Sequence, residues 1–226
     1  MIDCSRRIDM GINRKDLVDS ARSRSDIYGL LSTVFRHEPS QDLIKRMRSD
    51  SLLGIFTGLG VELGERFYND RESEVVEELA IEYARLFIGP GQHISAHESI
   101  FSEADGEMGG LWGVKTVEVK KFIQATGLEY GKNFTGLPDH ISVELEFMQK
   151  LTEWEADKWL QEDRESAEHC QLVQHKFLEK HLLCWVNSFC DAVLDQAEIP
   201  FYRVMAELTK QYMEFERLSI ATDTAA

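Results

Sequence analysis

One short stretch after Pro138 holds the residues whose types and spacing could do chemistry. Asp139 and His140 are neighbours, and a carboxylate beside an imidazole can work as an acid–base pair. His140 and Glu144 are four residues apart, so on a helix they would share a face and could bind a metal ion. No third and fourth ligand follows, however, and Asp139 stands where a helix N-cap residue belongs. The sequence therefore predicts no metal site, and helix capping by Asp139 is the simpler interpretation.

A second stretch, residues 127–133, partly matches a phosphate-binding loop. Three residues separate Gly127 from Gly131, where the motif needs four, and Asn133 follows the lysine in place of Ser or Thr. No strand leads into it. We interpret it as a helix end followed by a turn. No nucleophile elbow or Ser/His/Asp spacing is present either, so the sequence predicts no catalytic residues and no enzyme activity.

Cysteine and histidine occur, but not at the spacing of a zinc site. The four cysteines contain no C-x-x-C pair, which indicates reduced thiols packed as small apolar side chains. His181 would share a helix face with Phe177 and Trp185. We therefore expect His181 to be a hydrogen-bonded core residue.

The charge of the chain excludes several classes of partner. The 226 residues include 25 Lys and Arg against 40 Asp and Glu, a net charge of −15, and 43% are hydrophobic. Such a chain can fold around a core, but it lacks the clustered cations of a nucleic-acid binder or of a protein that docks on anionic membranes. Residues 1–48 are mildly basic, so the negative charge lies beyond them. A basic partner fits this distribution. One acidic run is interpreted as a solvated helix face: Glu74, Glu77, Glu78 and Glu82.

The ends of the chain predict little structure. Arg6 and Arg7 look like part of a twin-arginine export signal, but no apolar stretch follows them. We therefore expect a flexible N-terminus over residues 1–13 and a disordered tail over residues 219–226. No run approaches the roughly 18 apolar residues of a membrane helix, so stable membrane insertion is not expected.

The elements between the ends follow a helical period. Apolar residues recur at three- and four-residue spacing, and the four prolines fall between the periodic stretches. The pattern predicts one all-α, compact multi-helix domain over residues 14–218, including one helix that carries both Phe177 and Val193. Two irregular connections interrupt it, residues 89–114 and 127–137, and the second could act as a hinge.

Three segments together resemble the TorD-like family of molybdoenzyme maturation chaperones. They are Glu82–Pro90 (EYARLFIGP), Pro138–Met148 (PDHISVELEFM) and Phe177–Trp185 (FLEKHLLCW), the last completed by Phe201 and Tyr202. The resemblance spans about residues 20–217, with the segments in the family's order. The second segment is the most specific.

The resemblance implies a cytoplasmic, non-enzymatic chaperone with an all-helical fold. Members of the family bind the twin-arginine signal peptide of a molybdopterin-containing oxidoreductase and hold the precursor until its cofactor is inserted. No cofactor of its own is expected, although weak guanine nucleotide binding is possible by the resemblance. Monomers and domain-swapped dimers both occur in the family. Alternatives are an assembly factor that acts on the mature catalytic subunit without reading a leader, and a nucleotide-dependent enzyme that uses Asp139 and His140.

Six residues are expected in or near the peptide site: Leu86, Phe87, Ser99, Asp139, His140 and Glu144. The resemblance implies the first five through their motif positions, and Glu144 is added as a carboxylate at the rim. Asp139 is the first candidate to bind a leader arginine, because a carboxylate accepts two parallel hydrogen bonds from a guanidinium. Glu98, Glu103 and Glu144 are weaker candidates for this contact. The chain departs from the family at residues 95–97, which read Ser-Ala-His where a Pro-Pro-aromatic motif is frequent. The identity of the client therefore stays open.

Overall fold

The computed structural model describes residues 13–49, 61–89, 91, 93–104, 107–108, 110–132 and 134–224. The predicted flexible N-terminus lies outside these ranges except for Asn13. The side chain of Asn13 accepts the backbone N–H of Lys15 and so caps the first helix.

The described helices account for most of the structure. In chain order they are α1 (Arg14–Arg36), α2 (Gln41–Met47), α4 (Glu65–Asn69), α5 (Glu72–Tyr83), α6 (Glu98–Phe101), α7 (Val114–Ala125), α8 (Ile141–Leu160), α9 (Arg164–Lys180), α10 (Leu182–Gln196) and α11 (Pro200–Thr224). A π-helical turn, η1 (Ala84–Ile88), continues α5 directly. Two strands, β1 (Glu103–Ala104) and β2 (Glu107–Met108), pair antiparallel with Glu103 opposite Met108. The predicted all-α class is confirmed, with this hairpin as a small addition.

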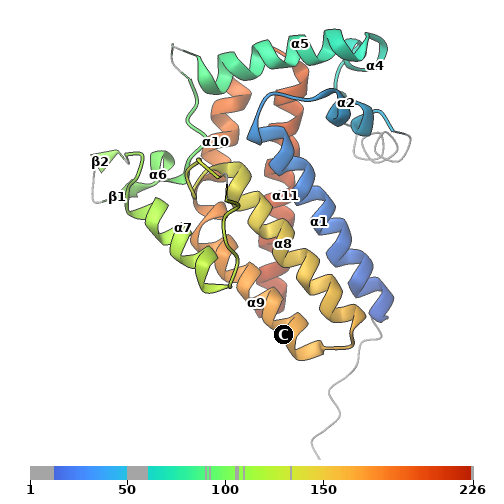
Figure 1. Ribbon diagram of the computed structural model, residues 1–226, viewed down its shortest axis with the longest axis vertical. Coiled ribbons are helices and arrows are strands. Elements are labelled where there is room, and N and C mark those ends of the chain that lie inside the picture. Colours follow the sequence, from blue (N-terminus) through green and yellow to red (C-terminus); the bar gives the residue numbers. More distant parts are fainter. Residues whose placement is uncertain are drawn as a thin grey trace, which may run out of the picture.

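The long helices lie side by side around one core (Figure 1). α1 packs most extensively against α8, α8 also packs against α9, and α10 packs against α11. α5 lies across one end of these helices, and α7 lies along one side. Bulky aromatic side chains fill the centre, and Tyr28, Phe177, Trp185 and Phe201 are almost completely buried. The apolar period read from the sequence therefore marks the faces that meet.

A buried ion-pair network connects four helices, α1, α8, α9 and α11. The guanidinium of Arg24 on α1 donates to Glu155 on α8 (3.1 Å), to Gln174 on α9 (2.7 Å) and to both carboxylate oxygens of Glu216 on α11 (2.8 Å each). The side chains of Glu155 and Glu216 are nearly inaccessible to solvent. Desolvation lowers the pKa of Arg24, but the hydrogen bond to Glu216 and the charges of Glu216, Tyr28 and Glu155 together outweigh it and raise the pKa.

Three expectations about the elements are wrong. The helix expected to carry both Phe177 and Val193 is two helices, because the backbone of His181 leaves the helical region (φ −127°, ψ −93°). The tail expected to be disordered from residue 219 is helical as far as Thr224. The connection over residues 89–114 is only partly irregular, since α6 and the β hairpin lie within it.

None of the helices in the described ranges is both long and apolar enough to cross a membrane. Nor do the residues with assigned positions contain a group of three or more His, Cys, Asp or Glu side chains arranged to hold a metal ion.

Candidate functional site

The site is built where the N-terminal ends of α6 and α8 meet. The backbone N–H of Glu98 donates to the carbonyl of Asp139 (2.9 Å), and the N–H of Ile141 donates to the carbonyl of Ala96 (2.8 Å). These two bonds form an antiparallel bridge between His97 and His140. Segments more than 40 residues apart in sequence are thereby held in register, and their acidic side chains are brought together.

Asp139 does not cap the helix that follows it, so the capping interpretation is wrong. His140 is the N-cap of α8, and its Nδ1 accepts the N–H of Ser142 (3.2 Å). Asp139 instead accepts the N–H of Ser99 (3.1 Å) in the first turn of α6. Its carboxylate is completely buried. Asp139 and His140 thus bond to separate partners, an arrangement that does not prepare them as an acid–base pair.

Two histidine rings stand edge to face beside this bridge. The centroids of His97 and His140 are 4.9 Å apart. Burial lowers the pKa of both imidazoles, and the neighbouring His97 helps to lower that of His140, to about 4. The charge of Asp139 opposes both shifts. Both rings are therefore neutral near pH 7.

Glu98 connects this bridge to the break between α9 and α10. Its carboxylate is completely buried, and its Oε2 lies 2.9 Å from Nδ1 of His181. His181 is itself buried, which confirms the expectation of a hydrogen-bonded core histidine. The ammonium of Lys115 on α7 approaches Oε1 of Glu98 to 3.9 Å, an ion pair that is too long for a hydrogen bond.

Glu144 completes the acidic group from the first turn of α8. The indole of Trp185 donates to its Oε2 (3.2 Å). Desolvation, followed by the charge of Glu98, raises the pKa of Glu144 well above the usual range, and the charge of Asp139 adds to this. The hydrogen bond from Trp185 acts in the opposite direction but is smaller than these effects together.

We call Glu98, Asp139 and Glu144 the carboxyl cluster. Within the described structure, each has one buried oxygen that meets no hydrogen-bond donor: Oε1 of Glu98, Oδ1 of Asp139 and Oε1 of Glu144. Leaving a buried acceptor unpaired costs about 1–3 kcal/mol, and more for a charged group. A hydrogen bond with Glu98 also helps to raise the pKa of Glu144, so a proton on Glu144 can satisfy part of the group, and the acceptors that remain are open to a donor from a ligand.

The loop over residues 127–137 covers the carboxyl cluster. The hydroxyl of Tyr130 is buried without a partner among the described residues, and burial, together with the charges of Asp139 and Glu144, raises its pKa to about 12. Tyr130 stacks on Phe134 within the loop, with centroids 4.9 Å apart. The backbone bond from Phe134 to Gly131 is also internal to the loop. Figure 1 shows this connection crossing in front of α8.

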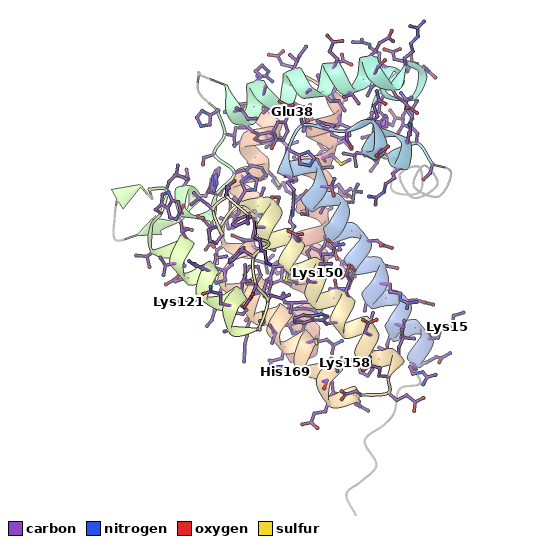
Figure 2. All side chains as sticks on the ribbon, viewed as in Figure 1. Lys15, Glu38, Lys121, Lys150, Lys158 and His169 are labelled. Carbon is purple, nitrogen blue, oxygen red and sulfur yellow. The ribbon has the colours of Figure 1, made fainter. Side chains whose placement is uncertain are left out.

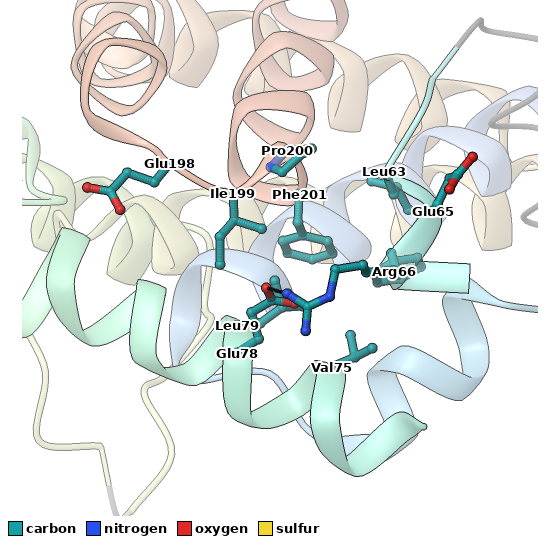
Figure 3. Close-up of a pocket in the computed structure, with 12 residues that line it drawn as sticks. Leu63, Glu65, Arg66, Val75, Glu78, Leu79, Glu198, Ile199, Pro200 and Phe201 are labelled. Carbon is teal, nitrogen blue, oxygen red and sulfur yellow. Dashed lines mark hydrogen bonds and ion pairs between the residues drawn. The ribbon is translucent and has the colours of Figure 1, made fainter. Parts of the chain in front are cut away.

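A separate, mostly apolar pocket of about 280 Å³ lies between α4, α5 and the start of α11 (Figure 3). Leu79 and Phe201 contribute to its walls, and an ion pair between Arg66 and Glu78 spans part of it. None of the six residues expected in the peptide site lines it. Beside it, Glu82 is buried and accepts the N–H of Glu198, so the expectation of a fully solvated acidic face is wrong for Glu82.

Comparison with known proteins places the chain in a family. The family model described as nitrate reductase delta subunit matches residues 56–191, which is more than half of the chain. The chain belongs to this family. The resemblance to TorD-like chaperones drawn from the three sequence segments is thereby confirmed.

Curated relatives of the chain carry the name chaperone protein TorD. A protein from Vibrio vulnificus is 23% identical over 202 residues, covering 82% of this chain and 88% of the relative. A protein from Photobacterium profundum is 25% identical over 205 residues, covering 85% and 92%. A crystal structure from Archaeoglobus fulgidus, described in terms of redox enzyme maturation, aligns with a TM-score of 0.49 at 21% identity, covering 83% of this chain and 93% of that one.

Four of the six residues expected in the peptide site lie together. Ser99, Asp139, His140 and Glu144 surround the bridge between α6 and α8. All but His140 are almost completely buried, so a peptide would reach them only if the covering loop moved.

The other two residues lie on the π-helical turn η1. Leu86 is completely buried, and its carbonyl accepts the N–H of Ile94 (2.7 Å), which links η1 to the segment leading to Glu98. Phe87 is half-buried among aromatic rings, 6.1 Å from Phe189. The exposed Ile88 follows it directly. Residues 93–98 therefore connect the apolar side chains of Phe87 and Ile88 on η1 with the carboxyl cluster.

Sequence reasoning underrated or missed three contributors to this site. Glu98 was only a weak candidate, because its role depends on the bridge to residue 140. Trp185 ends the third family segment and Tyr130 lies in the connection over residues 127–137, but neither was a candidate for the site. The side chain of Glu103, another weak candidate, lies outside the described part of the structure.

Proposed function

We propose that this TorD-like protein is a cytoplasmic chaperone that binds the twin-arginine signal peptide of a molybdopterin-containing oxidoreductase and holds the precursor for cofactor insertion before export. The observation that supports this most directly is the carboxyl cluster with its three unpaired, buried oxygens among the described residues. A guanidinium group offers five N–H donors in a fixed planar arrangement, so one arginine can satisfy several of these oxygens.

The charges around the cluster agree with a cationic ligand. Glu98 and Asp139 lie so close to Glu144 that they raise its pKa, and an arriving positive charge would relieve that repulsion. The ammonium of Lys115 stays 3.9 Å from Glu98 and does not neutralise the group as a whole. The ligand's apolar stretch would then extend along Phe87 and the exposed Ile88.

Entry of the peptide requires the loop over residues 127–137 to lift. Tyr130 stacks on Phe134 and Phe134 bonds to Gly131 within the loop, while Leu128 and Tyr130 also pack against the core. Lifting the loop would break the packing of Leu128 and Tyr130 on the core but would leave its internal contacts in place, and Gly127, with φ at +84°, would serve as the pivot.

The test is a titration of the purified chain with synthetic twin-arginine signal peptides of candidate molybdoenzymes, followed by fluorescence anisotropy. We expect Glu98→Gln and Asp139→Asn to weaken binding of the best peptide by about tenfold or more, because each removes a charge-assisted bond. Asp157→Asn on the exposed face of α8 is the matched control and should bind as the wild type does.

Changes in the peptide complete the experiment. Replacing both arginines by lysine should weaken binding, because an ammonium cannot make two parallel bonds, and replacing both by alanine should abolish it. Equal binding of the alanine peptide, or no binding of any intact leader at roughly tens of micromolar, would contradict the proposal. Co-purification with a leaderless catalytic subunit would then favour an assembly factor that acts on the mature enzyme.

A further inference from the structure

A second surface, opposite in charge to the carboxyl cluster, lies on the outer side of α7. We call it the α7 surface. It is defined by the residues Leu111, Trp112, Val114, Val117, Lys121 and Lys180. We infer that the α7 surface binds an acidic segment of a partner protein that also presents an apolar side chain.

The apolar part of the α7 surface is unusually exposed. Trp112 is 74% accessible, Val114 66%, Leu111 52% and Val117 46%. α7 packs on the protein through its other side, where Val119 is completely buried. Other large apolar side chains are exposed elsewhere, but four gathered within seven residues are typical of an interaction site.

The backbone holds Trp112 in its outward position. The N–H of Gly113 bonds to the carbonyl of Gly110 (3.1 Å), which closes a turn with Trp112 as its third residue. Trp112 has φ at +68°, a conformation that favours glycine and is costly for a tryptophan. The side chain therefore occupies this position although a glycine would suit the backbone better.

A basic pocket adjoins the apolar part. A cavity of about 510 Å³ is lined by Lys115, Lys121, Lys180, Glu118, Phe122 and His181. Lys115 pairs with Glu118 (3.0 Å), but Lys121 and Lys180 have no ion-pair partner among the residues that the structure describes. Val117 and Lys121 are four residues apart on α7 and share a face, so the apolar and basic parts are continuous. Figure 2 labels Lys121 on this helix.

The charge of the pocket decides the chemistry of the partner. The whole chain carries −15, so three lysines around one cavity form a local exception. Carboxylates of a partner would pair with Lys121 and Lys180, while an apolar side chain would cover Trp112 and Val117. A leader peptide with two arginines does not fit this surface. The inference is thus independent of leader recognition.

The test uses three labelled peptides of equal length and the full chain. One is rich in Asp and Glu with Leu and Phe anchors, one has the anchors replaced by serine, and one has the acids replaced by lysine. We expect only the first to bind, and we expect the double variant Lys121→Glu/Lys180→Glu to weaken it roughly tenfold or more. Lys150→Glu on α8 is the control for charge alone, and binding should persist in it.

Trp112→Gly separates binding from folding. Because glycine suits φ at +68°, this variant should unfold at the same or a higher denaturant concentration than the wild type. Its peptide binding should nevertheless fall roughly tenfold. Leader binding should be unchanged in all α7 variants, so a failure of this inference is distinguishable from a failure of the proposed function.

Three outcomes would overturn the inference. The first is equal binding of the acidic and basic peptides, or no effect of the lysine substitutions. The second is displacement of the acidic peptide by inorganic phosphate alone at matched ionic strength, which would assign the pocket to small anions. The third is a wild-type dimer that Trp112→Gly converts to a monomer in sedimentation, which would make a second copy of the chain the occupant.

Discussion

Nδ1 of His181 lies 2.9 Å from Oε2 of Glu98, and this contact separates two regions of opposite charge. On one side Glu98 belongs to the carboxyl cluster with Asp139 and Glu144. On the other, His181 forms part of the wall of the lysine-lined cavity beside α7. A cationic ligand and an acidic ligand would thus bind on either side of one buried pair.

Glu144→Gln should make stability less dependent on pH. The raised pKa of Glu144 means that the folded chain keeps this proton at pH values where the unfolded chain has lost it. The wild type therefore loses stability as pH rises above the unfolded value near 4.5, by about 1.4 kcal/mol per unit until the folded carboxyl ionises. Glutamine can still accept from Trp185.

Urea denaturation at pH 5 and pH 8 measures this effect. From pH 5 to pH 8, the free energy of unfolding of Glu144→Gln should rise relative to that of the wild type by about 1 kcal/mol or more. Asp157→Asn on the same helix should follow the wild type. Parallel curves for Glu144→Gln and the wild type would show that Glu144 is ionised in the fold.

His140→Asn should make the free energy of unfolding less sensitive to acid. His140 lowers the stability of the wild type as pH falls, whereas Glu144 lowers it as pH rises. The imidazole has a folded pKa of about 4, against 6.5 as its ordinary value, so the unfolded chain binds the proton first as pH falls. The wild type should lose about 2 kcal/mol between pH 7 and pH 5 that the variant keeps. Asparagine is a good N-cap, so the start of α8 is preserved. Thermal unfolding against pH checks this, with the exposed His169→Asn as control.

Arg24→Ala should be among the most destabilising single substitutions. It removes the cation between Glu155 and Glu216, and both carboxylates are nearly inaccessible to water. Removing one partner of a buried pair costs about 3–5 kcal/mol. Arg22→Ala, on the exposed side of the same helix, should cost far less. A loss below about 1 kcal/mol at Arg24, measured by chemical denaturation, would contradict the role assigned to this network.

Gly127→Ala tests the pivot of the covering loop. At φ of +84° an alanine is strained, so stability should fall by about 1–2 kcal/mol. Gly131→Ala in the same loop is the matched comparison, because a Cβ there meets nothing within 4 Å and no positive φ is involved. Similar losses for both variants would rule out a special role for Gly127. Denaturant titration of the two proteins provides the measurement.

Much of the fold was predictable because helical periodicity is a local property. The apolar spacing of α1, from Ala21 through Tyr28 to Phe35, marks its buried face without reference to other helices. Pro200 begins α11 as expected of a proline at a first helical turn. The break between α9 and α10 at His181 was not predictable, because the apolar pattern continues through it. Only the tertiary structure shows that the break places the His181 ring against Glu98.

The sequence by itself determined the all-α class, the family segments and a histidine bonded within the core, since residue type and short spacings suffice for these. Only the tertiary structure decided that Asp139 serves α6 rather than α8, and that Glu98 joins Glu144 in one buried group. The physical reason is that a carboxyl group's role depends on which donors and charges surround it. Those neighbours come from segments that are distant in the chain and meet only when it folds.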